Sequence, residues 1–141
     1  MRDHHGPLPL RGHAMAEPIV GILFVVAPWI FNFSDASDAT TVSIVLGALV
    51  LLTGLTTRWR MGVVKLLSLG AHRTMDLLVA AVAILAPFVL GFSDNGAATR
   101  FLIIMGVLEI GATLMTNWDA RDEFAVDPEH GARGGHAPMA R

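Results

Sequence analysis

Four long blocks of apolar residues, separated by short polar stretches, dominate the pattern of the chain. The blocks cover residues 17–33, 40–57, 75–92 and 99–118. A helix needs about 20 apolar residues to cross the ~30 Å hydrocarbon core of a bilayer, and about 17 is the lower limit. The pattern therefore predicts four transmembrane helices. The apolar stretch between the second and third blocks is too short to span, and it indicates a short helix lying on the membrane surface.

The second pair of blocks repeats the first pair at an offset of 59 residues. The clearest repeated feature is a proline and an aromatic residue near the end of one block, followed by a Ser-Asp turn. The motif residues are Pro28, Trp29, Ser34 and Asp35 in the first copy and Pro87, Phe88, Ser93 and Asp94 in the second. A period of this size marks a duplicated supersecondary unit. The predicted fold is an all-α membrane protein with two tandem helical hairpins, related by a pseudo-two-fold axis along the membrane normal.

These boundaries divide the chain into five parts. We expect a polar tail over residues 1–16, a first two-helix repeat over 17–59, a linker over 60–74, a second two-helix repeat over 75–118 and a polar tail over 119–141. In this division His13 belongs to the first tail and His72 to a solvated loop.

The motif predicts how the first helix of each pair begins and ends. Proline lacks a backbone N–H and clashes with the carbonyl four residues before it, so it belongs in the final turns, where water can satisfy the freed carbonyl. We expect the bent end to hold the aromatic residue against the neighbouring helix and to break at the serine. The aligned pairs Glu17/Asp76 and Asp35/Asp94 have the chemistry of ion sites, but they lie at expected helix boundaries, where the role we expect is to cap helices or interact with the helix dipole.

Composition narrows the possible function classes. Hydrophobic residues make up 53% of the chain and charged residues 16%, against roughly 45–50% and about 25% in an average soluble domain. The absence of cysteine excludes disulfides, thiolate metal sites and cysteine nucleophiles. A net charge of −2 without a basic stripe argues against a nucleic-acid partner. No Gly-rich phosphate loop, HExxH or haem motif occurs.

No catalytic, cofactor-binding or metal-binding residue is predicted from these patterns. The His4-His5 pair together with His13 has metal-ligand chemistry, but histidines in a polar tail are more simply explained as solvated side chains.

The distribution of positive residues sets the expected orientation. Nine of the ten Arg and Lys residues lie in the tails and the linker, and only Arg100 lies near the opposite side. By the positive-inside rule, both termini are cytoplasmic and the Ser-Asp turns face outward, as expected for a multi-pass protein of the cell (inner) membrane. Trp29, Trp59 and Trp118 are expected to be interfacial anchors.

The two motif copies and the helix pairs around them resemble the SPW-repeat family of small bacterial and archaeal membrane proteins. The repeat is named for a Ser-Pro-Trp triplet near the end of its first helix, which here reads Ala27-Pro28-Trp29 and Ala86-Pro87-Phe88. The serine is thus absent from both copies and the tryptophan from the second. The resemblance covers residues 17–118 and implies a four-helix membrane protein, without any catalytic or binding residue to carry over.

Glu109 is the one ionisable residue near the middle of an apolar block, and its repeat partner is Val50. Such a residue is a functional candidate by default, because a charge in hydrocarbon is costly unless it is paired or neutralised. No intramembrane Arg, Lys or His is expected as a partner, because Arg100 lies near the membrane surface. Three roles are open: a protonated carboxyl bonded to a neighbouring helix, for instance through Thr53, a contact with another subunit, and ion or proton handling.

We expect a non-enzymatic accessory, scaffold or assembly subunit that packs against other membrane helices or against copies of itself. Small-residue faces, such as the one around Gly47, favour this because they let helices approach closely in lipid. The alternative is a small oligomeric transporter or channel with Glu109 in its pathway. The expected partners are the lipid bilayer and membrane proteins, and no cofactor is expected.

Overall fold

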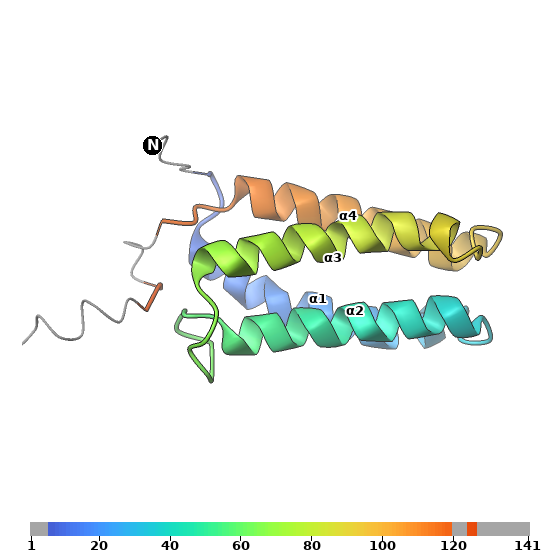
Figure 1. The fold of residues 1–141 in the computed structure, drawn as a ribbon, viewed down its shortest axis with the longest axis horizontal. Helices are drawn as coiled ribbons and strands as arrows, with labels where there is room; N and C mark the ends of the chain where they lie inside the picture. The colour runs from blue at the N-terminus through green and yellow to red at the C-terminus, as the bar shows by residue number, and fades with distance from the viewer. Residues whose placement is uncertain (1–5, 120–123, 127–141) are drawn as a thin grey trace, which may run out of the picture.

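The computed structural model describes residues 6–119 and 124–126. Its helices are α1 (Leu10–Ile30), α2 (Ser37–Thr56), α3 (Leu69–Val89) and α4 (Gly96–Met115). All four are long and apolar enough to cross a membrane. The described residues otherwise form only isolated β-bridges. The prediction of an all-α, four-helix membrane fold is therefore confirmed (Figure 1).

The helices form two hairpins that lie side by side. α1 pairs with α2 and α3 pairs with α4, so that both hairpin turns lie at one end of the bundle and the linker lies at the other (Figure 1). Each helix boundary in the second hairpin lies 59 residues after its counterpart in the first. The repeat offset in the sequence is therefore also the offset between the helix boundaries. The pseudo-two-fold axis stays a prediction.

The first helix of each hairpin begins earlier than predicted. α1 starts at Leu10 instead of residue 17, and α3 starts at Leu69 instead of residue 75. Residues 10–16, assigned to a polar tail, are helical, so the expected helix opening at Glu17 is wrong. The first turns of α1 and α3 carry polar side chains that are buried against one another. The apolar blocks therefore begin later than the helices do, and hydrophobic periodicity misses these turns.

Residues 57–68, between α2 and α3, contain no helix, so the predicted interfacial helix is wrong, and residues 69–74 of the expected linker belong to α3. Thr57 forms a parallel bridge with Leu67, and Trp59 forms an antiparallel bridge with Ala125. The N–H of Leu67 also donates to the carbonyl of Thr56 (2.8 Å). The segment folds back in turns instead of forming a helix, because its backbone groups bond to the end of α2 and to residues 124–126.

The repeated motif forms the ends of α1 and α3. The N–H of Phe33 donates to the carbonyl of Pro28 (2.8 Å), and the equivalent bond in the second repeat is 2.9 Å long. Between donor and acceptor stand Asn32 (φ 56°) and, in the second repeat, Gly91 (φ 75°). A six-to-one bond across a left-handed residue is the Schellman arrangement that ends helices. Each proline thus lies in the final turn, as predicted, but the helix ends before the serine.

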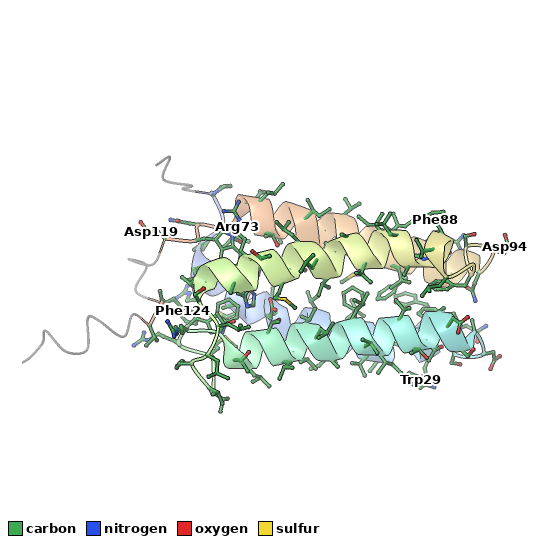
Figure 2. The ribbon with its side chains drawn as sticks, viewed as in Figure 1. Trp29, Arg73, Phe88, Asp94, Asp119 and Phe124 are labelled. Atoms are coloured by element: carbon green, nitrogen blue, oxygen red, sulfur yellow. The ribbon has the colours of Figure 1, made fainter. Side chains whose placement is uncertain are left out.

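Other details of the motif differ from the prediction. Trp29 is 61% exposed and Phe88 is 58% exposed, on the outside of the bundle (Figure 2). They do not pack against the neighbouring helix, and this position suits aromatic anchors at a membrane interface. In the described residues, neither Asp35 nor Asp94 caps a helix; Asn95 caps α4 instead, through the N–H of Ala98 (3.0 Å).

Small residues allow the helices within each hairpin to approach closely. A Cβ atom on Gly47 of α2 would lie 2.6 Å from the carbonyl oxygen of Gly21 on α1. A Cβ atom on Gly106 of α4 would lie 2.8 Å from the carbonyl oxygen of Ala80 on α3. The predicted small faces are therefore used inside the hairpins. Between the hairpins, an apolar cluster fills the half of the bundle nearer the turns, with Phe24, Phe33, Phe92 and Phe101 among its members.

Candidate functional site

Four buried polar residues meet between α1 and α3, at the linker end of the bundle. His13 and Glu17 lie one turn apart on α1, and His72 and Asp76 lie one turn apart on α3. None of the four is more than 4% exposed. Each repeat therefore contributes one imidazole and one carboxylate, and the offset of 59 residues relates the two contributions.

The four side chains form a closed ring. His13 Nε2 lies 3.4 Å from Glu17 Oε2 and 3.3 Å from Asp76 Oδ2. His72 Nε2 lies 3.5 Å from Glu17 Oε1 and 3.2 Å from Asp76 Oδ1. Each carboxylate thus turns one oxygen toward each imidazole. A set of four ligand atoms, one from each residue, lies within 4.8 Å of one another.

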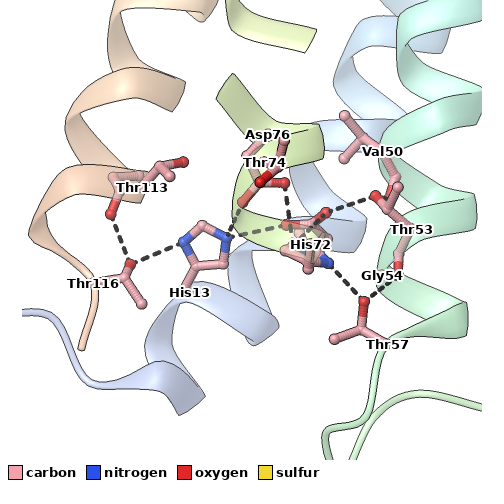
Figure 3. A network of polar contacts seen from close by, with 12 residues as sticks. His13, Val50, Thr53, Gly54, Thr57, His72, Thr74, Asp76, Thr113 and Thr116 are labelled. Atoms are coloured by element: carbon pink, nitrogen blue, oxygen red, sulfur yellow. Dashed lines mark hydrogen bonds and ion pairs between the residues drawn. The ribbon is translucent and has the colours of Figure 1, made fainter. Parts of the chain in front are cut away.

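Hydrogen bonds on the far side of each ring fix its tautomer. His72 Nδ1 lies 2.7 Å from Thr57 Oγ1, and His13 Nδ1 lies 3.0 Å from Thr116 Oγ1 (Figure 3). Each threonine hydroxyl already donates its proton to the carbonyl four residues before it, at 2.6 and 2.7 Å. A hydroxyl has only one proton to donate, so it accepts from the imidazole. This network assigns a hydrogen to Nδ1, so Nε2 carries the lone pair when the ring is neutral and a second hydrogen when the ring is protonated.

The two Nε2 atoms point into the ring of carboxylates. Both Nε2 atoms and Asp76 Oδ2 are buried without a hydrogen-bond partner in the described part of the chain. A nitrogen lone pair that faces a carboxylate across 3.2–3.5 Å is repelled at low dielectric, unless the nitrogen carries a proton or a metal cation lies between the two groups. The arrangement of His13, Glu17, His72 and Asp76 therefore suits either two imidazolium–carboxylate ion pairs or one bound metal cation.

The dimensions of the ring are somewhat wider than those of a transition-metal site. Tetrahedral zinc, with bonds of about 2.0–2.2 Å, keeps neighbouring ligand atoms roughly 3.3–3.6 Å apart. The nitrogen–oxygen distances of 3.2–3.5 Å involve both oxygens of each carboxylate, and the set with one atom from each residue lies within 4.8 Å, so the ligand atoms would move closer together around a bound ion. A divalent ion would also cancel the charges of the two carboxylates, which a buried site requires.

Two indole rings cover the imidazoles and complete the helix ends. The Trp59 ring lies 4.4 Å from that of His72, and the Trp118 ring lies 4.9 Å from that of His13, between centroids. Each indole N–H donates, at 2.8 Å, to the carbonyl five residues before it. These bonds satisfy carbonyls that a helix C-terminus leaves unpaired. Trp59 is 1% exposed, so its predicted role as an interfacial anchor is wrong.

A pocket of about 90 Å³ reaches Glu17 from between α1 and α2. Gly54 makes room for the Glu17 side chain, because a Cβ atom on Gly54 would lie 2.8 Å from Glu17 Cγ. Thr53 Oγ1 lies 3.4 Å from Glu17 Oε1 and donates to the carbonyl of Val50 at 2.9 Å. In the second repeat, Thr113 occupies the position of Gly54. The two halves of the site are thus alike in their ligands and different in their surroundings.

Glu109 lies close to this site without belonging to the ring. It is 7% exposed on α4 and interacts electrostatically with all four ring residues. The expectation that no histidine lies near it within the membrane helices is therefore wrong. Thr53, its expected partner, lies instead against Glu17.

The hydropathy pattern does not predict the four ring residues, but their spacing in the sequence does. His13 and Glu17 are four residues apart, as are His72 and Asp76, and both spacings recur at the offset of the repeat. Residues four apart lie on one face of a helix. A polar pair kept in both copies on one face predicts two facing pairs once the hairpins pack. The readings of His13 as a tail residue, of His72 as a solvated residue and of Glu17 and Asp76 as helix caps are all wrong.

Comparison with family models matches residues 11–116 to the SPW repeat domain. This match covers most of the chain and contains the four ring residues and both threonines that bond to the imidazoles. Comparisons with curated proteins and with solved structures found no match. The chain therefore belongs to the SPW repeat family and is a multi-pass membrane protein.

Proposed function

We propose that this protein binds one divalent transition-metal ion, with zinc preferred, between its two repeats. One observation carries the proposal: two imidazole Nε2 atoms and two carboxylates converge in a buried ring, and both Nε2 atoms lack any other partner in the described residues. Imidazole nitrogen and carboxylate oxygen are common zinc ligands. Magnesium and calcium prefer oxygen ligands alone, so the two histidines favour a transition metal.

The proposed ion has a structural role. Four protein ligands complete a tetrahedron, whereas catalytic zinc sites keep a position open for water or substrate. Because α1 and α3 supply two ligands each, the ion would clamp the two hairpins together. Thr57 and Thr116 would orient the imidazoles, as outer partners of metal ligands usually do. We accordingly propose a non-enzymatic protein.

The structure bears differently on the two roles expected from the sequence, transport and packing against other membrane proteins. Transport through one chain would need polar groups from Glu109 to the turns, whereas the buried cluster described there is apolar and aromatic. Packing against other membrane proteins stays a prediction, and the face around Gly47 no longer supports it because that face is used within the first hairpin. From the Arg and Lys distribution, we propose an inner-membrane location with the metal site and both termini on the cytoplasmic side.

Metal content of the full-length protein tests the proposal. The protein is purified in mild detergent without a histidine tag, and bound metals are counted by mass spectrometry. We expect about one zinc per chain. Asp76→Asn should remove the ion, whereas Asp94→Asn, which changes an exposed aspartate at the opposite end, should keep it. A folded protein that stays metal-free after incubation with zinc would contradict the proposal.

A further inference from the structure

A second candidate site lies at the opposite end of the bundle, near the hairpin turns. A groove of about 460 Å³ separates α1 from α4 there, and these two helices pack less closely than α2 and α3. Its lining includes Leu23, Phe31, Arg100, Phe101, Ile104 and Met105. Apart from Arg100, all of these side chains are apolar. In a bilayer, such a groove is filled by lipid chains.

The positive charge at the groove is specific to one side of the bundle. Arg100 and Phe101 stand where the first repeat has Thr41 and Val42, so the equivalent place between α2 and α3 carries no positive charge. The Phe101 ring packs on the Phe31 ring, with 5.2 Å between centroids, and together they form an aromatic wall. The repeat thus provides a matched surface of the same chain that lacks the site.

Arg100 is placed to bind a phosphate. Its side chain is exposed and has no ion-pair partner in the described part of the chain. Its guanidinium lies over Gly96, with Nη1 3.0 Å from where a Cβ atom of that glycine would be. A guanidinium matches the geometry of phosphate oxygens, and the apolar stem of arginine packs along hydrocarbon.

The surrounding charges favour a particular headgroup. Asp94 is exposed two residues before Gly96, and Asp35 and Asp38 are exposed around the other turn. These carboxylates repel a headgroup that carries only negative charge. A headgroup that joins a phosphate to a primary ammonium would complement both signs, because the ammonium can donate hydrogen bonds to a carboxylate.

We propose that this groove binds one ethanolamine phospholipid. An acyl chain lies along Phe31, Phe101 and Ile104, the phosphate bonds to Arg100, and the ammonium faces Asp94. The site is separate from the metal ring, so this proposal stands whether or not the protein binds a metal.

Native mass spectrometry of the full-length protein tests the proposal. The protein is titrated with ethanolamine, choline and glycerol phospholipids of identical acyl chains. We expect one ethanolamine lipid to be retained preferentially. Arg100→Gln should weaken that binding about tenfold, as expected for the loss of a charge-assisted bond. Arg73→Gln, at the opposite end of the bundle, is the matched control and should change nothing (Figure 2).

Two further variants separate the parts of the site. Ile104→Trp fills the groove without changing a charge and should also reduce retention of the lipid. Asp94→Asn should remove the preference for ethanolamine over glycerol headgroups and keep binding to Arg100. Circular dichroism shows that each variant is folded, and if Arg100→Gln does not fold, the groove-filling variant carries the test. Equal retention of the three lipids, or retention unchanged by both Arg100→Gln and Ile104→Trp, would overturn the proposal.

Discussion

Replacing Gly54 by alanine should weaken metal binding without removing a ligand. The added Cβ atom would lie 2.8 Å from Glu17 Cγ, whereas ordinary van der Waals contact begins at 3.4 Å. The Glu17 side chain must therefore move by about 0.6 Å, while ligand distances in a metal site hold to within about 0.2 Å. Because Glu17 is flexible, the fold should tolerate the change better than the site does.

We expect a loss of roughly 10- to 100-fold in zinc affinity, the range observed when groups that hold metal ligands are altered. Competition with a zinc-binding dye measures this affinity in detergent. Gly111→Ala is the matched control, because it also replaces a helical glycine and its Cβ atom would have nothing within 4 Å. Both variants gain helix propensity of up to about 1 kcal/mol. If Gly54→Ala binds zinc as tightly as Gly111→Ala, Glu17 is not a ligand and the reasoning fails.

Three other changes probe the site and its surroundings. Thr57→Val removes the partner of His72 Nδ1 and should lower zinc affinity by about 10- to 100-fold, whereas Thr56→Val, at a half-buried neighbour, should leave zinc competition unchanged. Removing the ion with a chelator should lower the melting temperature, since a ligand at 100 times its Kd stabilises a fold by about 2.7 kcal/mol. A melting temperature that does not change with zinc concentration would argue against an ion that holds the two hairpins together. Trp59→Phe loses the bond that closes α2 and should cost about 0.5–1.5 kcal/mol in denaturant unfolding, whereas Trp29→Phe, on the exposed surface, should cost close to nothing.

The fold could be predicted from the sequence because lipid imposes a simple rule. Each span must satisfy its own backbone in a helix and present an apolar surface, so four apolar blocks are enough to predict four helices. The repeat offset also follows directly from the residues, and the helix limits obey it. The ends of α1 and α3 were predicted in outline, since proline marks a final turn, whereas the left-handed Asn32 that sets the stopping point is specified by local backbone geometry.

The site could not be predicted from hydropathy because its residues are polar and lie at the edge of the apolar blocks. His13 and His72 look like solvated residues until two helices, 59 residues apart in sequence, are placed against each other. Trp59 and Trp118 resemble interfacial anchors for the same reason, although Trp59 is buried over the ring. Glu109 is the one ionisable residue near the middle of an apolar block, but the polar residues near it come from α1 and α3.

X-ray absorption at the zinc edge tests the central claim most directly. The full-length protein, carrying one equivalent of zinc, should show about four nitrogen or oxygen ligands near 2.0–2.1 Å. Outer-shell scattering from two imidazole rings should accompany them, because His13 and His72 both supply ligands. A shell of six oxygens without imidazole scattering would place the ion elsewhere and contradict the assignment of this ring as a metal site.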